Sequence, residues 1–327
     1  MSKLVTIFGG SGFVGRYIAR RMANEGWRVR VAVRRPNEAL FVKPYGVVGQ
    51  VEPVFANIRD DASVAAAING ADAVVNCVGI LAPSGKNTFD AVQADGAARI
   101  ARIAAEQGVT GFVQISAIGS DADGASAYSR TKAAGEAAVL EHMPNASILR
   151  PSIVFGVEDQ FFNRFASMAR LGPVLPIVGA ETKFQPVYVD DVAKAAVALL
   201  TGDAKPGIYE LGGPDVKTFR EMMTDMLEVI QRRRIVFGMP FFAAKAMAFG
   251  FDMLETVSLG MVPNGMLTRD QLKNLARDNV ASADLPGLAD LGIEATPYSS
   301  VLPDYLWRFR NSGQYADIKA SAKNLDN

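Results

Sequence analysis

Residues 5–19, VTIFGGSGFVGRYIA, decide the fold of this chain. An apolar run rich in β-branched residues leads into a turn with Gly9, Gly12 and Gly15, and a stretch with helical spacing follows. Read from Gly10, the same stretch has the spacing G-x-G-x-x-G. Glycine at these places permits a tight turn, lets the backbone approach a pyrophosphate without an intervening Cβ, and allows close helix packing. Because the turn follows a strand and opens a helix, the sequence predicts a dinucleotide site rather than a glycine turn without a ligand.

Short apolar runs alternate with longer helical patterns over the first 150 residues. The expected strands span 4–8, 28–33, 51–56, 71–78, 111–116 and 146–150, and the expected helices follow the glycine turn and span 89–107 and 126–142. Strands that alternate with helices indicate a parallel sheet. We therefore predict an α/β fold in which residues 1–150 form a Rossmann domain with a doubly wound parallel sheet. Residues 151–327 are predicted to form a smaller C-terminal α+β domain on the docking or substrate side, parts of which return to the Rossmann sheet.

The end of the second predicted strand carries two arginines. The stretch RVRVAVRRP places Arg34 and Arg35 where a site that reads the ribose 2′-hydroxyl has an acidic residue. A carboxylate would repel a 2′-phosphate, whereas a guanidinium can donate two charge-assisted hydrogen bonds to it. The sequence therefore predicts NADP(H) as the cofactor. The alternative is a solvated basic strand end.

Composition excludes several classes of site. Lysine plus arginine equals aspartate plus glutamate, at 34 each, so the net charge gives no indication of a nucleic-acid partner. The single cysteine, Cys77, cannot form an intramolecular disulfide, and we expect a buried structural thiol. The single histidine, His142, excludes nearly all histidine-based triads and histidine-rich metal centres. No metal site is predicted.

The sequence also bears on membranes. It runs directly from Met1 into a strand and the glycine turn, so we expect no targeting peptide and a cytoplasm-like compartment. No stretch reaches the roughly 18 uninterrupted apolar residues of a spanning helix. A stretch from Val236 to Pro263 is nevertheless rich in large apolar side chains, and QRRR precedes it at 231–234. These side chains are Phe241, Phe242, Met247, Phe249, Phe251, Met253 and Leu254. They form either the core of the second domain or a face that contacts a membrane or a partner.

Four motifs together resemble the extended and atypical short-chain dehydrogenase/reductases. They are FGGSGFVG at 8–15, NCVG at 76–79, YSRTK at 128–132 and RPSIVFG at 150–156. The resemblance implies pyrophosphate contacts from Gly9, Ser11, Gly12, Phe13 and Val14. It also implies that Asn57 and Ile58 lie beside the adenine, that Val78 and Gly79 line the ribose, and that Pro151 and Ile153 line the nicotinamide.

The same resemblance gives Tyr128 and Lys132 two possible roles. Residues four apart on a helix share a face, so both side chains point into one pocket. In an active family member the tyrosine transfers a proton, while the lysine lowers the tyrosine pKa and binds the nicotinamide ribose. Ser116 is the candidate third catalytic residue, but Ala117 follows it, and Gln93 replaces the asparagine that commonly supports the proton relay. The catalytic set is therefore partial, and the pair also suits a protein that only binds nucleotide.

A narrower likeness lies in the second half of the chain. The stretches RPSIVFGVEDQFFNRFASMARLGPVLPIVG at 150–179 and KFQPVYVDDVAKA at 183–195 are similar to the nucleotide-binding accessory subunits of respiratory complex I. That likeness implies a non-catalytic NADPH-binding subunit that stabilises the region near the quinone site and contacts other complex I subunits. We expect it on the cytoplasmic side of a bacterial inner membrane, held peripherally through the C-terminal domain. The alternative is an NADP-dependent reductase or epimerase acting on a small or nucleotide-linked carbonyl substrate.

Overall fold

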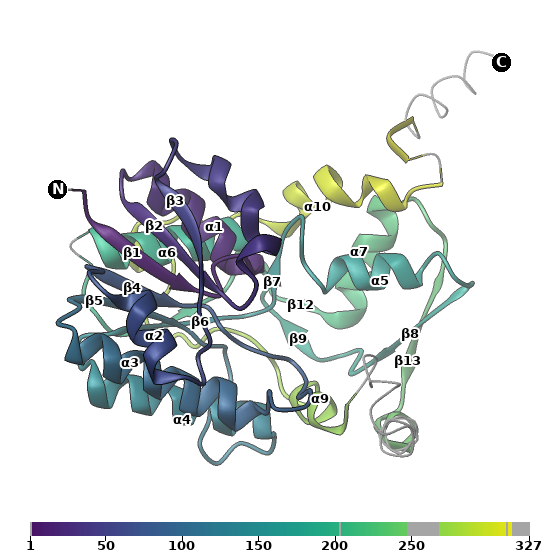
Figure 1. The fold of residues 1–327 in the computed structure, drawn as a ribbon. Coiled ribbons are helices and arrows are strands. Elements are labelled where there is room, and N and C mark those ends of the chain that lie inside the picture. Colours follow the sequence, from purple (N-terminus) through teal and green to yellow (C-terminus); the bar gives the residue numbers. More distant parts are fainter. Residues whose placement is uncertain (1, 203, 247–267, 312, 316–327) are drawn as a thin grey trace. The chain divides into compact units, whose positions relative to one another are not determined.

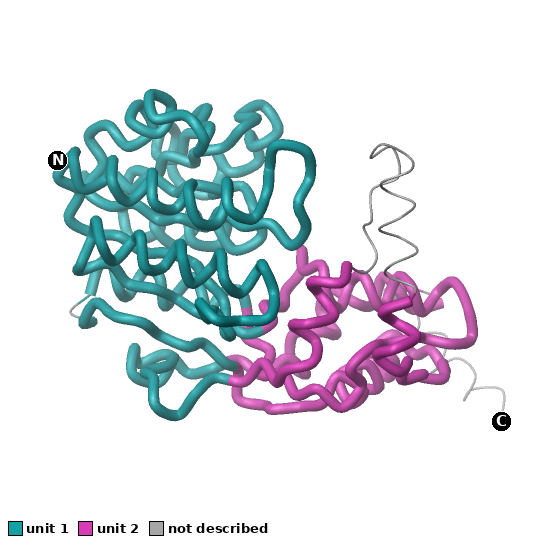
Figure 2. Tube along the Cα trace, turned by 90° about the horizontal axis from the view of Figure 1, so that it is seen from below, with its two compact units in different colours: residues 1–152, 189–212, 281–295 teal, residues 153–188, 213–280, 296–327 magenta. Residues whose placement is uncertain are grey.

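The computed structural model describes residues 2–202, 204–246, 268–311 and 313–315 (Figure 1). The chain divides into two compact units (Figure 2). Unit 1 comprises Met1–Ser152, Val189–Gly212 and Ala281–Ala295, and unit 2 comprises Ile153–Tyr188, Gly213–Val280 and Thr296–Asn327. The chain therefore passes repeatedly from one unit to the other.

Unit 1 is built on a seven-stranded parallel sheet with the order β3-β2-β1-β4-β5-β6-β11. All five residues of β1 and all four of β4 are buried, as expected for strands covered on both faces. The sheet confirms the predicted doubly wound α/β fold. Its strands are β1 (Leu4–Phe8), β2 (Arg28–Val33), β3 (Val51–Phe55), β4 (Ala73–Asn76), β5 (Gly111–Ile115), β6 (Ser147–Pro151) and β11 (Ile208–Leu211).

Helices cover both faces of this sheet (Figure 1). One face carries α1 (Phe13–Asn24) and α6 (Val189–Thr201), and the other carries α2 (Asp61–Ile68), α3 (Asp95–Glu106) and α4 (Ala127–His142). Side-chain caps fix where two of these helices begin, because Asp60 accepts from the Ser63 amide and Ser126 accepts from the Ser129 amide. The 3₁₀ segment η1 (Pro36–Tyr45) follows β2, and the π-helical turn η2 (Asp90–Ala94) leads into α3.

The point where the strand order reverses lies between β1 and β4. β1 pairs with β2 on one side and with β4 on the other, and Phe8 is level with both Ala32 and Asn76. The chain leaves β1 outward through β2 and β3 and then returns to β4. In open α/β sheets, a crevice outside the carboxyl ends of the strands at such a switch point binds the ligand.

Unit 2 consists of short strand pairs and helices around an aromatic core. The pairs are β7 (Val154–Phe155) with β10 (Val187–Tyr188), β9 (Lys183–Phe184) with β12 (Lys217–Thr218), and β8 (Val174–Val178) with β13 (Ile235–Met239). In the part of this unit that the structure describes, the α-helices are α5 (Phe162–Met168), α7 (Phe219–Val229), α9 (Arg269–Asn274) and α10 (Tyr298–Leu306). Phe155, Phe162 and Phe219 are buried at the centre of this unit. Thr218 and Glu221 form a capping box at the start of α7.

A distant segment of the chain returns to the edge of the Rossmann sheet. Within residues 281–295, the Pro286 carbonyl accepts from the amide of Glu210, which lies in the edge strand β11. The Ser282 amide donates to the Glu210 carboxylate at 2.8 Å. The Pro286 bond pairs one backbone group of an edge that would otherwise be unpaired.

Candidate functional site

The glycine turn between β1 and α1 leaves too little space for a side chain at Gly9 or Gly15. Gly9 has a φ of +72°, and a Cβ there would stand 3.3 Å from the Cys77 carbonyl carbon and 3.3 Å from Val78 Cγ2. A Cβ on Gly15 would stand 2.4 Å from the Gly9 carbonyl oxygen, which is closer than real contacts allow. The turn therefore requires glycine at both positions, and it brings the loops after β1 and β4 together.

The start of α1 fits a phosphate group. Gly12 is the N-cap residue and has no side chain with which to cap the helix, and the first turn holds no acidic residue. The first amide groups of a helix have no partner within the helix, and the helix dipole favours an anion there. Gly12 is exposed, and a Cβ on it would meet only the Gly9 carbonyl oxygen within 4 Å. The predicted contact residues Ser11, Phe13 and Val14 lie in the same short segment, so this part of the chain fits the pyrophosphate of a dinucleotide.

Lys132 on α4 reaches the same edge of the sheet. A Cβ on Gly79 would stand 3.4 Å from Lys132 Nζ, and this ammonium donates to the Ile115 carbonyl at 3.2 Å. The side chain of Asn76 shapes the intervening turn, because its Oδ1 accepts from the Val78 amide at 3.0 Å. The structure thus brings the predicted ribose residues Val78 and Gly79 next to Lys132 and the glycine turn.

The predicted adenosine end is open to solvent. Arg34 and Arg35 are exposed at the end of β2, and Arg35 pairs with Glu38 at 3.0 Å. Asn57 and Ile58 follow the neighbouring strand β3, and both are half-buried. The Asn57 amide donates to a serine hydroxyl in α2, and Ile58 packs over Gly96 of α3.

Burial changes the pKa values of the tyrosine and the lysine in opposite directions. Desolvation lowers the pKa of Lys132 to about 8, although the Glu136 carboxylate raises it. Desolvation raises the pKa of Tyr128 to about 12. Lys132 Nζ lies 6.0 Å from the centroid of the Tyr128 ring, and Phe89 packs edge-on against that ring. At neutral pH the phenol therefore keeps its proton and Lys132 is largely a cation.

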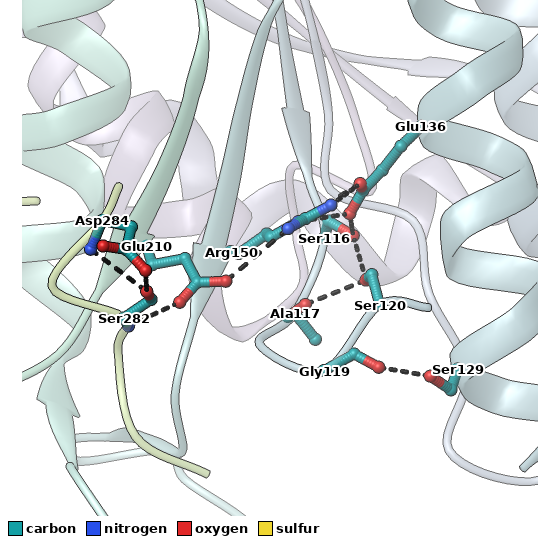
Figure 3. A network of polar contacts seen from close by, with 10 residues as sticks. All are labelled: Ser116, Ala117, Gly119, Ser120, Ser129, Glu136, Arg150, Glu210, Ser282 and Asp284. Atoms are coloured by element: carbon teal, nitrogen blue, oxygen red, sulfur yellow. Dashed lines mark hydrogen bonds and ion pairs between the residues drawn. The ribbon is translucent and has the colours of Figure 1, made fainter. Parts of the chain in front are cut away.

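Ser116 belongs to a buried polar network (Figure 3). Its hydroxyl donates to the Glu136 carboxylate and lies 3.0 Å from the Ser120 hydroxyl. Arg150 donates to both oxygens of Glu136, at 2.6 to 3.2 Å, and lies 3.6 Å from the Glu210 carboxylate. The network continues to the returning segment through Ser282. The Ser116 hydroxyl is thus directed toward Glu136.

The residues that follow Ser116 offer no hydroxyl that could take its catalytic role. Ala117 and Ile118 carry none, and the hydroxyl of Ser120 donates to the Ala117 carbonyl at 2.9 Å. Gln93 also has a local role, because its amide nitrogen donates to the Ile80 carbonyl at 2.7 Å and its oxygen accepts from Thr131 at 3.0 Å. These bonds connect η2 to the loop after β4 and to α4.

Sequence reasoning did not single out Glu136, Arg150 or Glu210. One signal was available, because Glu136 lies one helical turn beyond Lys132 on α4 and faces the same way. The other two residues lie on β6 and β11, which only the sheet order makes neighbours. Cys77 is partly buried as a residue, and desolvation raises the pKa of its thiol to about 12, as expected for the predicted buried thiol.

The two predicted nicotinamide residues lie on different units. Pro151 ends β6, and its carbonyl accepts from the Ile118 amide at 3.1 Å. Ile153 belongs to unit 2, where it packs against the aromatic core. Their joint contact with a nicotinamide stays a prediction.

Comparison with known proteins gives one family and several relatives. The model of the NAD dependent epimerase/dehydratase family matches residues 5–212. The mitochondrial NADH dehydrogenase [ubiquinone] 1 alpha subcomplex subunit 9 of Arabidopsis thaliana is 33% identical over 95% of this chain and 79% of its own length. A ceramide reductase of Caulobacter vibrioides is 29% identical over 72% of the chain and 74% of its own length.

Solved structures support the fold alone. The UDP-glucose 4-epimerase of Thermus thermophilus in complex with NAD superposes with a TM-score of 0.67 over 94% of this chain and 99% of its own, at 19% identity. The family match and this superposition agree with the resemblance drawn from the four motifs.

The predicted bacterial inner-membrane location is wrong. The relatives from Arabidopsis, Dictyostelium, Neurospora and mouse that are NADH dehydrogenase subunits are mitochondrial proteins. Among the helices that the structure describes, none is long and apolar enough to cross a bilayer.

Proposed function

Because the chain belongs to the NAD dependent epimerase/dehydratase family, as a relative of the complex I subunit 9 proteins, we propose that it is an NADP(H)-binding accessory subunit of respiratory complex I. In this proposal it performs no hydride transfer and stabilises the region near the quinone site. The observation that carries the non-catalytic part is the Ser116 hydroxyl, which is buried and donates to Glu136. A group that orients a substrate carbonyl must point into the pocket.

The chain's own residues would hold the cofactor in distinct ways. The amides at the start of α1 would bind the pyrophosphate, and the Lys132 ammonium would donate to the nicotinamide ribose. Arg34 and Arg35 would bind the 2′-phosphate of NADP(H), as their position at the end of β2 suggests. A bound nicotinamide would supply hydride chemistry only to a substrate placed beside it.

Tyr128 is not prepared for proton transfer in the structure. A general acid or base works best with a pKa near the working pH, whereas desolvation raises the pKa of Tyr128 to about 12. The Lys132 ammonium lies 6.0 Å from the ring centroid. This arrangement supports a binding role for the pair.

A reductase is the second candidate, and two observations favour it. The tyrosine and lysine of an active site are both present, and the ceramide reductase of Caulobacter vibrioides is similar over 72% of this chain. In that case a nucleotide-dependent carbonyl reduction would use Tyr128 as the proton donor.

Replacing Tyr128 by phenylalanine separates the two candidates. For an accessory subunit, the variant should retain wild-type nucleotide content and NADH:quinone activity of the assembled complex. For a reductase, the wild-type chain should turn over a carbonyl substrate with NADPH, and the variant should lose roughly a hundredfold or more of that activity. Detection of such turnover in a carbonyl screen would contradict the proposal.

We further propose that unit 2 makes the membrane-side contact, through the outer face of the β8–β13 ribbon. In the parallel register Ile235 pairs with Val174 and Phe237 pairs with Pro176, so these four side chains share one face. Ile235 is 67% exposed and Phe237 51% exposed, whereas the opposite face packs into the core. Exposed apolar surface of this kind usually marks a contact.

Arginines beside this ribbon suit anionic lipid headgroups. Arg233 is exposed and lies two residues before Ile235 in the sequence. Desolvation lowers the pKa of Arg232, and the positive charges of Arg234 and Arg170 lower it further. The three guanidinium groups therefore lie close together. Basic side chains next to inserted apolar ones are typical of peripheral membrane surfaces.

The phenylalanines that the sequence suggested for this contact divide between two environments. Phe241 is half-buried and packs against a small cluster around Leu272, whereas Phe242 is 76% exposed. The remaining apolar side chains of that stretch, Met247, Phe249, Phe251, Met253 and Leu254, lie outside the described residues. The ribbon face and Phe242 are therefore the better targets for a docking experiment.

A further inference from the structure

Arg16 connects the glycine turn to the segment that follows β2. It lies in the first turn of α1, and its side chain turns back toward the loop. Nη2 donates to the Ser11 carbonyl at 3.0 Å and Nε donates to the Gly12 carbonyl at 3.3 Å. The guanidinium also stacks on the ring of Phe41, with its central carbon 4.8 Å from the ring centroid.

The contacts of Arg16 lie at the two segments that would hold the adenosine half of a dinucleotide. Phe41 belongs to η1, which begins directly after Arg35 at the end of β2. In a dinucleotide-binding unit the glycine turn lies at the pyrophosphate, and the end of β2 lies at the adenosine ribose. Arg16 therefore spans the two segments between which the ribose 2′-position would fall.

This inference rests on the proposed NADP(H) site. We propose that Arg16 is a specificity-determining residue that binds the 2′-phosphate together with Arg34 and Arg35. A phosphate monoester carries roughly −1.5 to −2 charges at pH 7, so more than one guanidinium is needed to neutralise it. Arg34 and Arg35 are exposed, whereas Arg16 is held by two carbonyls and an aromatic face and loses less side-chain freedom on binding.

A purely structural role for Arg16 makes a different prediction. If the side chain only stabilises the glycine turn, its loss weakens the binding of NADPH and of NADH equally, because both contain the same pyrophosphate. If it binds the 2′-phosphate, its loss weakens the binding of NADPH selectively. The ratio of the two affinities therefore separates the roles.

The experiment measures dissociation constants for NADPH, NADH and adenosine 2′,5′-bisphosphate by calorimetry, on the full chain stripped of nucleotide. Arg16→Gln should weaken the affinity for NADPH and for the bisphosphate by about tenfold to a hundredfold, as expected for the loss of one charge-assisted contact. It should change the affinity for NADH by less than about threefold. Arg16→Lys keeps the charge but loses the planar fork, so it should give an intermediate loss. Arg20→Gln is the matched control, because Arg20 lies one turn further along α1, is exposed and stacks on Tyr17 instead.

Several outcomes would overturn the proposal. Equal losses for NADPH and NADH in Arg16→Gln would assign the side chain to the turn alone, and unchanged affinities would remove any role in binding. If Arg16→Gln does not fold, Arg16→Lys must still show the selective loss, and its absence would reject the proposal. A wild-type chain that binds NADH as tightly as NADPH would overturn the proposed NADP(H) preference itself, whatever the variants do.

Discussion

Lys132 should make the nucleotide-free protein less stable than a variant without it. The side chain is 6% exposed, and burial lowers its pKa from 10.5 to about 8. One pKa unit corresponds to about 1.4 kcal/mol, so holding this ammonium in the folded chain costs on the order of 3 kcal/mol. We expect Lys132→Met to stabilise the nucleotide-free protein by about 1 to 3 kcal/mol at pH 7 and to weaken NADPH binding.

The neighbours of Lys132 keep their partners in this variant. The Ile115 carbonyl still accepts from the Gln114 amide at 3.2 Å, and Glu136 still pairs with Arg150 at 2.6 Å. No buried group that bonds Lys132 in this part of the structure is left without a partner. The gain from removing the buried charge is therefore not cancelled by a new unsatisfied group.

The pH dependence has a definite sign. Below pH 8 Lys132 is protonated in the folded and the unfolded state, so its cost is fully present. Between pH 8 and 10.5 the folded chain releases this proton while the unfolded chain keeps it, so the stability of the wild type rises with pH. The advantage of Lys132→Met should therefore shrink as the pH is raised from 8 to 10.

Urea unfolding of nucleotide-free protein between pH 7 and 10 measures this difference. Trp27 is buried in unit 1 and Trp307 lies in unit 2, so fluorescence in a Trp307→Phe background reports on unit 1. A Lys132→Met variant that is less stable at pH 7, or an advantage that does not change with pH, would refute the reasoning.

Three further predictions concern the cofactor, the network and the ribbon. Arg34→Asp with Arg35→Asp should abolish NADP(H) in acid extracts of the purified protein, and recovery of NAD alone from the wild type would contradict the predicted preference. Arg150→Met leaves two buried carboxylates without their cation and should lower the free energy of unfolding of unit 1 by about 3 to 5 kcal/mol. Ser116→Ala should lower it by only about 1 kcal/mol, and equal losses of the two variants in urea unfolding would argue against the network. Ile235→Ser with Phe237→Ser should reduce co-sedimentation with anionic phosphatidylglycerol vesicles and leave NADPH affinity unchanged, and undiminished sedimentation would place the contact elsewhere.

Local patterns were sufficient to predict six of the seven strands of the Rossmann sheet, β1 to β6. Glycine spacing, β-branched runs and helical periodicity are properties of neighbouring residues, and the strands at 4–8 and 28–33 have the predicted bounds. The helix α2 escaped detection because its sequence, DASVAAAI, has almost no contrast between its apolar and polar faces. Lys132 lies beside Gly79, and the pocket that the helical spacing of YSRTK indicates for both side chains stays a prediction.

What the sequence determined by itself was therefore the sheet, the glycine turn and which residue types would meet at its carboxyl edge. Only the tertiary structure decided what those residues can do. Ser116 occupies a plausible catalytic position in the sequence, but its hydroxyl direction depends on Glu136 of α4 and Arg150 of β6. Arg150 in turn approaches Glu210 of β11, whose position beside β6 follows from the strand order and not from any local pattern. A side chain's partners in a buried network come from segments distant in sequence, because a buried charge must be paired and only the packed chain provides the counter-charge.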